Sequence, residues 1–108
     1  MASFQQLTPQ EVKARLDAGD DIVLLDVRER QEFEFNRLEG AVFRPLSQIH
    51  TWVRELDKTK EYVVYCHHGM RSQQACMFMY HNGFQKLNNL YGGIDLWSHD
   101  VDPTVPVY

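Results

Sequence analysis

Two apolar runs, residues 21–27 and 62–66, constrain the fold of this chain most strongly. Each has the length of one strand and little polar character, which is typical of strands buried on both sides of a parallel sheet. Segments with helical spacing lie between the strand candidates, and parallel strands need crossovers of that kind. The sequence therefore predicts an α/β domain with a mostly parallel sheet.

The first helix has the clearest boundaries. Thr8 is a good N-cap, Pro9 suits the first helical position, and Glu11 completes a capping box. Gly19 supplies the stop. Further helices are expected over residues 28–36, 47–56, 72–83 and 94–99, further strands over 40–46 and 86–93, and an extended tail from about residue 99 to residue 108.

Composition excludes several classes of function. The 108 residues suit a single domain, and the net charge of -4 without a lysine or arginine run disfavours nucleic acid and anionic membranes as partners. No apolar run approaches the length of a membrane span. The first residues lack the features of a signal peptide, so the expected location is the cytoplasm. There the two cysteines would remain thiols.

Cys66 follows a buried strand at the point where ligands bind in α/β sheets. The loop that follows it, residues 67–72, can curl around the sulfur so that its backbone N–H groups form an anion cradle. Gly69 lets the backbone turn, Arg71 adds a permanent cation, and a helix expected to begin at Ser72 adds a positive dipole end. These groups favour a negative charge on sulfur, so Cys66 is predicted to be a reactive thiolate.

The alternative for Cys66 is a small buried apolar residue at a strand end, which the electropositive setting disfavours. Cys76 is the opposite case. It lies on the inner face of the expected helix, beside Ala75 and before Met79, so we expect it to belong to the core. A role in resolving a disulfide is the minority alternative.

Only four residues separate Cys66 from Arg71, namely His67, His68, Gly69 and Met70. This is one residue fewer than in the loop of the cysteine phosphatases. A shorter ring makes a smaller pocket. It suits a single sulfur anion better than a tetrahedral phosphate, all of whose oxygens need donors.

The loop Cys-x-x-Gly-x-Arg-Ser after a "VVYC" strand resembles the active-site loop of the rhodanese (sulfurtransferase) family. Residues 24–49 are similar to the family's first signature and residues 82–97 to its closing one. The tail resembles that of rhodanese modules found with activating enzymes of ubiquitin-like proteins. One departure is Asn36-Arg37-Leu38, where the family usually has Gly-His-Ile, and it concerns the packing of that turn.

The resemblance implies a single rhodanese domain over residues 1–108, with a five-stranded, mostly parallel sheet flanked by helices on both faces. It implies that Cys66 takes sulfur from a small anionic donor such as thiosulfate and passes it, as a persulfide, to cyanide or a thiol. Residues 67–72 would bind the donor. Neither a metal nor an organic cofactor is expected.

His67 and His68 could contact donor or acceptor, titrate near neutral pH, or face solvent. A metal site is disfavoured, because neighbouring side chains in a tight loop usually diverge and zinc wants three or four convergent ligands. Asp26 and Arg28 follow an earlier strand and are expected near the Cys66 loop. For this pair we favour a structural ion pair over a direct part in catalysis.

Three functions compete. The leading hypothesis is an active sulfurtransferase. The second is a non-catalytic or sulfur-carrier module that docks a partner, and the retained Cys66 argues against an inactive form of it. The third is a phosphatase or arsenate reductase of related fold, which the loop length disfavours.

Overall fold

A five-stranded sheet forms the centre of the computed structural model, which describes residues 4–108. The strand order is β1-β5-β4-β2-β3, and every neighbouring pair is parallel. The predicted α/β class and mostly parallel sheet are therefore confirmed. The strands are β1 (Gln5–Leu7), β2 (Ile22–Asp26), β3 (Val42–Phe43), β4 (Glu61–Tyr65) and β5 (Lys86–Leu90).

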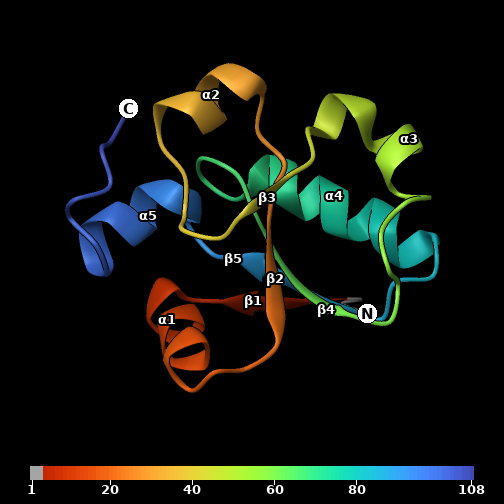
Figure 1. The fold of residues 1–108 in the computed structure, drawn as a ribbon, viewed down its shortest axis with the longest axis horizontal. Coiled ribbons are helices and arrows are strands. Elements are labelled where there is room, and N and C mark those ends of the chain that lie inside the picture. The colour runs from red at the N-terminus through yellow and green to blue at the C-terminus, as the bar shows by residue number, and fades with distance from the viewer. Residues whose placement is uncertain (1–3) are drawn as a thin grey trace.

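Helices cover both faces of this sheet (Figure 1). One apolar cluster contains Val12 of the first helix and Trp97 of the last, and the other contains Trp52 and Cys76. Each cluster includes residues from alternate positions of β4, because successive side chains of a strand point to opposite faces. The helices are α1 (Pro9–Asp17), α2 (Arg30–Phe35), the 3-10 turn η1 (Leu46–Gln48), α3 (Ile49–Trp52), α4 (Met70–His81) and α5 (Gly93–Asp100).

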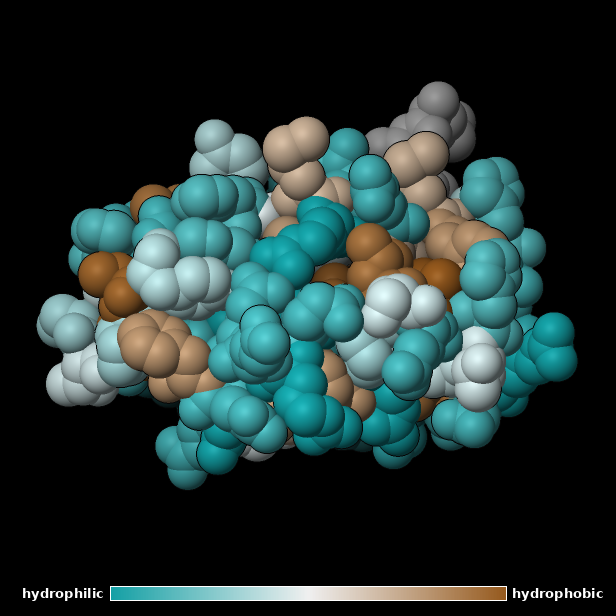
Figure 2. Space-filling view, turned by 90° about the horizontal axis from the view of Figure 1, so that it is seen from above, coloured by the Kyte–Doolittle hydropathy of each residue, from teal (hydrophilic) through white to brown (hydrophobic). Residues whose placement is uncertain are grey.

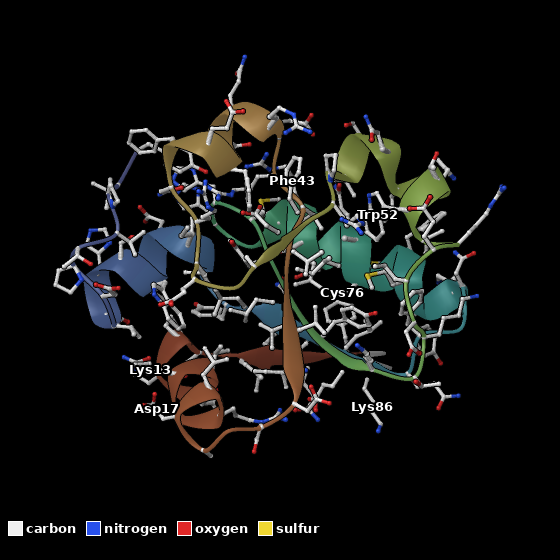
Figure 3. The ribbon with its side chains drawn as sticks, in the orientation of Figure 1. Lys13, Asp17, Phe43, Trp52, Cys76 and Lys86 are labelled. Carbon is white, nitrogen blue, oxygen red and sulfur yellow. The ribbon has the colours of Figure 1, made fainter. Side chains whose placement is uncertain are left out.

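The capping box that was predicted for the first helix is present. The Thr8 hydroxyl accepts from the Glu11 N–H, and the Glu11 carboxylate accepts from the Thr8 N–H. The two tryptophans are buried, at 2% exposure for Trp52 and 7% for Trp97. Cys76 lies on the inner side of α4 and is fully buried, which places it in the core as predicted (Figure 3).

The structure differs locally from the sequence prediction. The strand expected over residues 40–46 is limited to Val42–Phe43, and the strand expected over residues 86–93 ends at Leu90. The edge strand β1 was not predicted, because its first two residues, Gln5 and Gln6, are polar and exposed. Residues 47–56 do not form one helix: η1 and the four-residue α3 give way to turns before Leu56. The helix that was expected to begin at Ser72 begins two residues earlier, at Met70.

The register of the sheet brings the sequence motifs together. Asp26 of β2 pairs with Tyr65 of β4, so the chain leaves both strands side by side, toward Arg28 and Cys66 respectively. β5 lies on the other side of β4 and ends in the same direction. The carboxyl edge of the sheet is therefore where the predicted site residues meet.

The outer surface is mostly hydrophilic on the face seen in Figure 2, where apolar side chains gather only in small groups. Within residues 4–108, none of the helices has both the length and the apolar character needed to cross a membrane.

We predict that Thr8→Ala lowers the free energy of unfolding by about 1 kcal/mol, because it removes the acceptor for the Glu11 N–H. Urea denaturation followed by tryptophan fluorescence measures the change. Thr51→Ala is the control: Thr51 is exposed on α3, and its change should stay within about 0.5 kcal/mol. Equal effects of the two substitutions would contradict the capping assignment.

Candidate active site

Cys66 lies directly after β4, and its sulfur is the centre of the loop that follows. The sulfur accepts the N–H of Gly69 at 3.1 Å and the N–H of Ser72 at 3.4 Å. The Ser72 hydroxyl is also 3.4 Å away. Cys66 is only 1% exposed, so these donors surround a sulfur that water barely reaches.

Gly69 makes this arrangement possible. Its φ of 107° lies in the left-handed region, where residues with a side chain are strained. The chain therefore turns straight from the loop into α4, and Ser72 falls in the first turn of the helix. The N–H groups of a first turn have no partner within the helix. The Cys66 sulfur accepts one of these N–H groups, that of Ser72, and so lies at the positive end of the α4 dipole.

The carbonyl side of the loop is held by α5. The N–H of Ile94 donates to the Cys66 carbonyl at 2.9 Å, and the N–H of Asp95 donates to the His67 carbonyl at 3.1 Å. Gly93 approaches so closely that an added Cβ would run into both carbonyl oxygens. The close packing of α5 on the loop therefore requires a glycine at this position.

Asn89 of β5 holds the loop from the sheet. Its Nδ2 donates to the Gly69 carbonyl at 3.1 Å, and its Oδ1 accepts from the Ser72 hydroxyl. The single proton of that hydroxyl can point to Asn89 or to the sulfur, so a thiolate and Asn89 compete for it. Sequence reasoning missed Asn89. The available signal was two asparagines, Asn88 and Asn89, in a strand that turned out to be buried.

Arg71 does not face the sulfur alone. Its guanidinium donates to both oxygens of Glu32 in α2, at 2.7 and 2.8 Å. These bonds lower the pKa of Glu32 to about 2 and raise that of Arg71. The expected cation is therefore partly neutralised, and its forked donor set ties the loop to α2.

Arg28 is completely buried, and so is its partner Asp26. All of its N–H groups are engaged, by the Asp26 carboxylate, by the side chain and carbonyl of Asn36, and by the Tyr108 hydroxyl. No N–H of Arg28 is left for a ligand. The pair joins β2 to the start of the turn at Asn36, in agreement with the structural ion pair favoured from the sequence.

The imidazoles of His67 and His68 do not diverge, contrary to the expectation. They stack with 4.0 Å between ring centroids and 15° between planes. Burial and the neighbouring His68 lower the pKa of His67, so its ring is neutral at neutral pH.

With Asp95, the two histidines bring three potential metal ligands within 4.8 Å. The Nε2 atoms of both histidines lie near the Asp95 carboxylate, at 3.8 Å for His67 and 3.7 Å for His68. A ring nitrogen binds a metal in the plane of its ring, however, and the two rings are nearly parallel, so one ion cannot lie in both ring planes unless a ring turns. That the site works without a metal stays a prediction.

Tyr108 completes the surroundings of the loop, and sequence reasoning gave it no role. Its hydroxyl donates to Glu32 at 2.7 Å and accepts from Arg28 at 2.9 Å, while its ring stacks on His67. The expected tail is therefore bound to its own domain. α5 extends to Asp100, two residues into the segment that was expected to be the tail.

A family model matches most of the chain that forms this sheet and its cysteine loop. The family described as rhodanese-like domain matches residues 8–100. The chain belongs to the rhodanese-like family. That the domain extends over all of residues 1–108 stays a prediction.

Relatives of this rhodanese-like chain include named sulfurtransferases. The thiosulfate sulfurtransferase GlpE of Pseudomonas syringae is 35% identical over 97 residues, which cover 90% of either protein. The putative sulfurtransferase YtwF of Bacillus subtilis is 31% identical over 100 residues, 93% of this chain and 96% of that protein. A rhodanese-related protein of Thermoplasma volcanium has a solved structure that superimposes with a TM-score of 0.84. It is 26% identical, and the match covers 97% of this chain and all of that one.

The environment of Cys76, the second cysteine of this rhodanese-like domain, makes its thiol unreactive. Cys76 is fully buried between α4 and the sheet, and burial raises the pKa of its thiol to about 12. A thiol that stays protonated is a poor nucleophile. This environment agrees with the core role predicted for Cys76 and disfavours a resolving role.

We predict that Glu32→Gln lowers the free energy of unfolding at neutral pH and that the loss shrinks in acid. The folded-state pKa of Glu32 is about 2, below its ordinary value of 4.5. The ion pair with Arg71 therefore stabilises the fold fully above pH 4.5 and loses this contribution as the pH falls toward 2. Urea denaturation over a series of pH values measures the difference between variant and wild type.

Glu34→Gln is the matched control, since Glu34 is exposed on the same helix. Its effect should be small at every pH. A difference between Glu32→Gln and wild type that stays constant from neutral pH into acid would show that the charge of Glu32 does not stabilise the fold.

Proposed function

We propose that this rhodanese-like chain is a sulfurtransferase that carries sulfur as a persulfide on Cys66. The observation that supports this most directly is the sulfur at the centre of its loop, with the N–H groups of Gly69 and Ser72 directed at it. Such donors stabilise a thiolate before loading and the persulfide anion afterwards. The names of GlpE and YtwF point to the same chemistry.

In the first half-reaction, the Cys66 thiolate attacks the outer sulfur of a donor such as thiosulfate. A bond forms between the two sulfurs, the sulfur–sulfur bond of thiosulfate breaks, and its electron pair leaves with sulfite. In the second, cyanide or a thiolate attacks the outer sulfur of the persulfide, and the Cys66 thiolate is restored. No net oxidant is consumed, because the sulfur is transferred in the same oxidation state.

The remaining residues of the loop have supporting roles in this proposal. His67, His68 and Met70 belong to the loop that would meet the donor, and Arg71 keeps the loop in place through its bonds to Glu32. The N–H groups of the loop and the positive end of α4 attract the donor's negative charge. A reducing compartment such as the cytoplasm suits the reaction, because Cys66 must remain a thiol in order to be loaded.

We predict that Cys66→Ala lowers sulfur transfer from thiosulfate to cyanide by roughly a thousandfold or more, since it removes the nucleophile. Thiocyanate formation measures the rate. Mass spectrometry after incubation with thiosulfate should show one added sulfur on the wild type and none on the variant. Cys76→Ala is the control and should keep both the activity and the added sulfur.

Other outcomes identify the competing functions. A protein that gains the sulfur but does not pass it to cyanide or to a small thiol is a carrier module. A protein that hydrolyses an aryl phosphate with dependence on Cys66 is a phosphatase. The absence of any Cys66-dependent loading or turnover would contradict the proposal.

A further inference from the structure

The segment after α5 runs back toward α2 and the Cys66 loop. Val101 and Val105 pack against the apolar cluster beneath α1 and α5, which fixes the start of the segment. The Asn36 side chain then donates to the Pro106 carbonyl at 2.6 Å. The segment is therefore attached to the body of the domain before it reaches Tyr108.

Tyr108 spans the space between α2 and the Cys66 loop. On the side of α2, the Tyr108 hydroxyl donates to Glu32. The rings of Tyr108 and Phe35 also make an edge-to-face contact, with 5.6 Å between their centroids. On the side of the loop, the Tyr108 ring lies on His67 with 4.0 Å between centroids and 22° between planes. Contacts on both sides fix the position of the ring.

The partners of Tyr108 belong to the Cys66 loop or are bonded to it. His67 is the neighbour of Cys66 in the chain, and Glu32 holds Arg71. The pKa of Arg71 is raised chiefly by its bonds to Glu32, and Cys66 and Tyr108 make smaller contributions. Cys66 is 1% exposed, so a donor reaches its sulfur only past such neighbours.

We propose that Tyr108 forms one wall of the entrance to Cys66 and restricts the site to small sulfur donors. This inference rests on the proposed sulfurtransferase function and specifies the size of the substrate. A donor as small as thiosulfate passes beside the ring, whereas a bulky organic persulfide meets it. The ring acts through its volume, and the hydroxyl serves to hold it in place.

Asn36 links this wall to the departure from the family pattern at residues 36–38. Its Oδ1 accepts from Arg28 at 2.6 Å, while its Nδ2 holds the Pro106 carbonyl. A glycine, which the family usually has at this position, could make neither bond. The side chain of Asn36 therefore attaches the returning segment to the buried ion pair of Arg28 and Asp26.

The test compares Tyr108→Ala, Tyr108→Phe and the wild type by the rate at which Cys66 is alkylated. The small reagent is iodoacetamide and the large one is fluorescein maleimide, with Cys66→Ala as the blank. Alkylation does not depend on sulfur transfer, so it reports on access alone. Tyr80→Ala is the matched control, because Tyr80 is 47% exposed on α4 and Tyr108 is 44% exposed.

Tyr108→Ala removes the ring and opens one side of the entrance. The rate of Cys66 alkylation by the large reagent should therefore rise about tenfold relative to the rate with the small reagent. Tyr108→Phe keeps the ring and should preserve the wild-type ratio to within about threefold. Tyr80→Ala should leave the ratio unchanged. An unchanged ratio in Tyr108→Ala, or an equal rise in Tyr80→Ala, overturns the proposal.

A second measurement separates this inference from the proposed function. In the wild type, thiosulfate should be used with a higher kcat/KM than glutathione persulfide, and Tyr108→Ala should shift that ratio toward the larger donor. Failure of sulfur transfer in the wild type, with the alkylation ratio changed as expected, would overturn the function alone. Transfer in the wild type without any shift in Tyr108→Ala would overturn the size restriction alone.

Discussion

The fixed loop around the Cys66 sulfur is the constraint on which the rest of the structure depends. A thiolate surrounded by amides is stabilised only if those amides cannot turn away. Asn89 holds the loop through the Gly69 carbonyl, and α5 holds it through the carbonyls of Cys66 and His67. β5 and α5 therefore orient the donors that face the sulfur, although neither contributes a reacting atom.

The positive potential at the Cys66 sulfur comes more from backbone N–H groups than from charged side chains. Both nearby arginines are paired with carboxylates, Arg28 with Asp26 and Arg71 with Glu32, and the chain carries a net charge of -4. A paired guanidinium attracts an anion less than a free one does. The N–H groups of Gly69 and Ser72 donate to the sulfur and to no carboxylate of residues 4–108, so they supply the directed positive potential there.

The sequence predicted the parts that are encoded locally. The strands before Asp26 and Cys66, the capping box at Thr8 and the turn at Gly69 all follow from neighbouring residues. The partners of the loop could not be found this way. Glu32 is 39 residues from Arg71, and Asn89 is 20 residues from Gly69. The sequence of β5 is not clearly typical of a buried strand, and this has a physical reason. Its two asparagines form hydrogen bonds instead of packing against apolar side chains.

Glu32 connects the loop to the returning segment, since it accepts from both Arg71 and Tyr108. With a pKa of about 2 it stays ionised at any physiological pH, and the tyrosine hydroxyl, whose pKa is raised to about 12, stays a donor. The lowered pKa of His67 keeps its ring neutral, so the stack with Tyr108 carries no charge. All three groups keep one protonation state near neutrality, so the hydrogen bond between Glu32 and Tyr108 and the stack of Tyr108 on His67 do not change with small changes in pH.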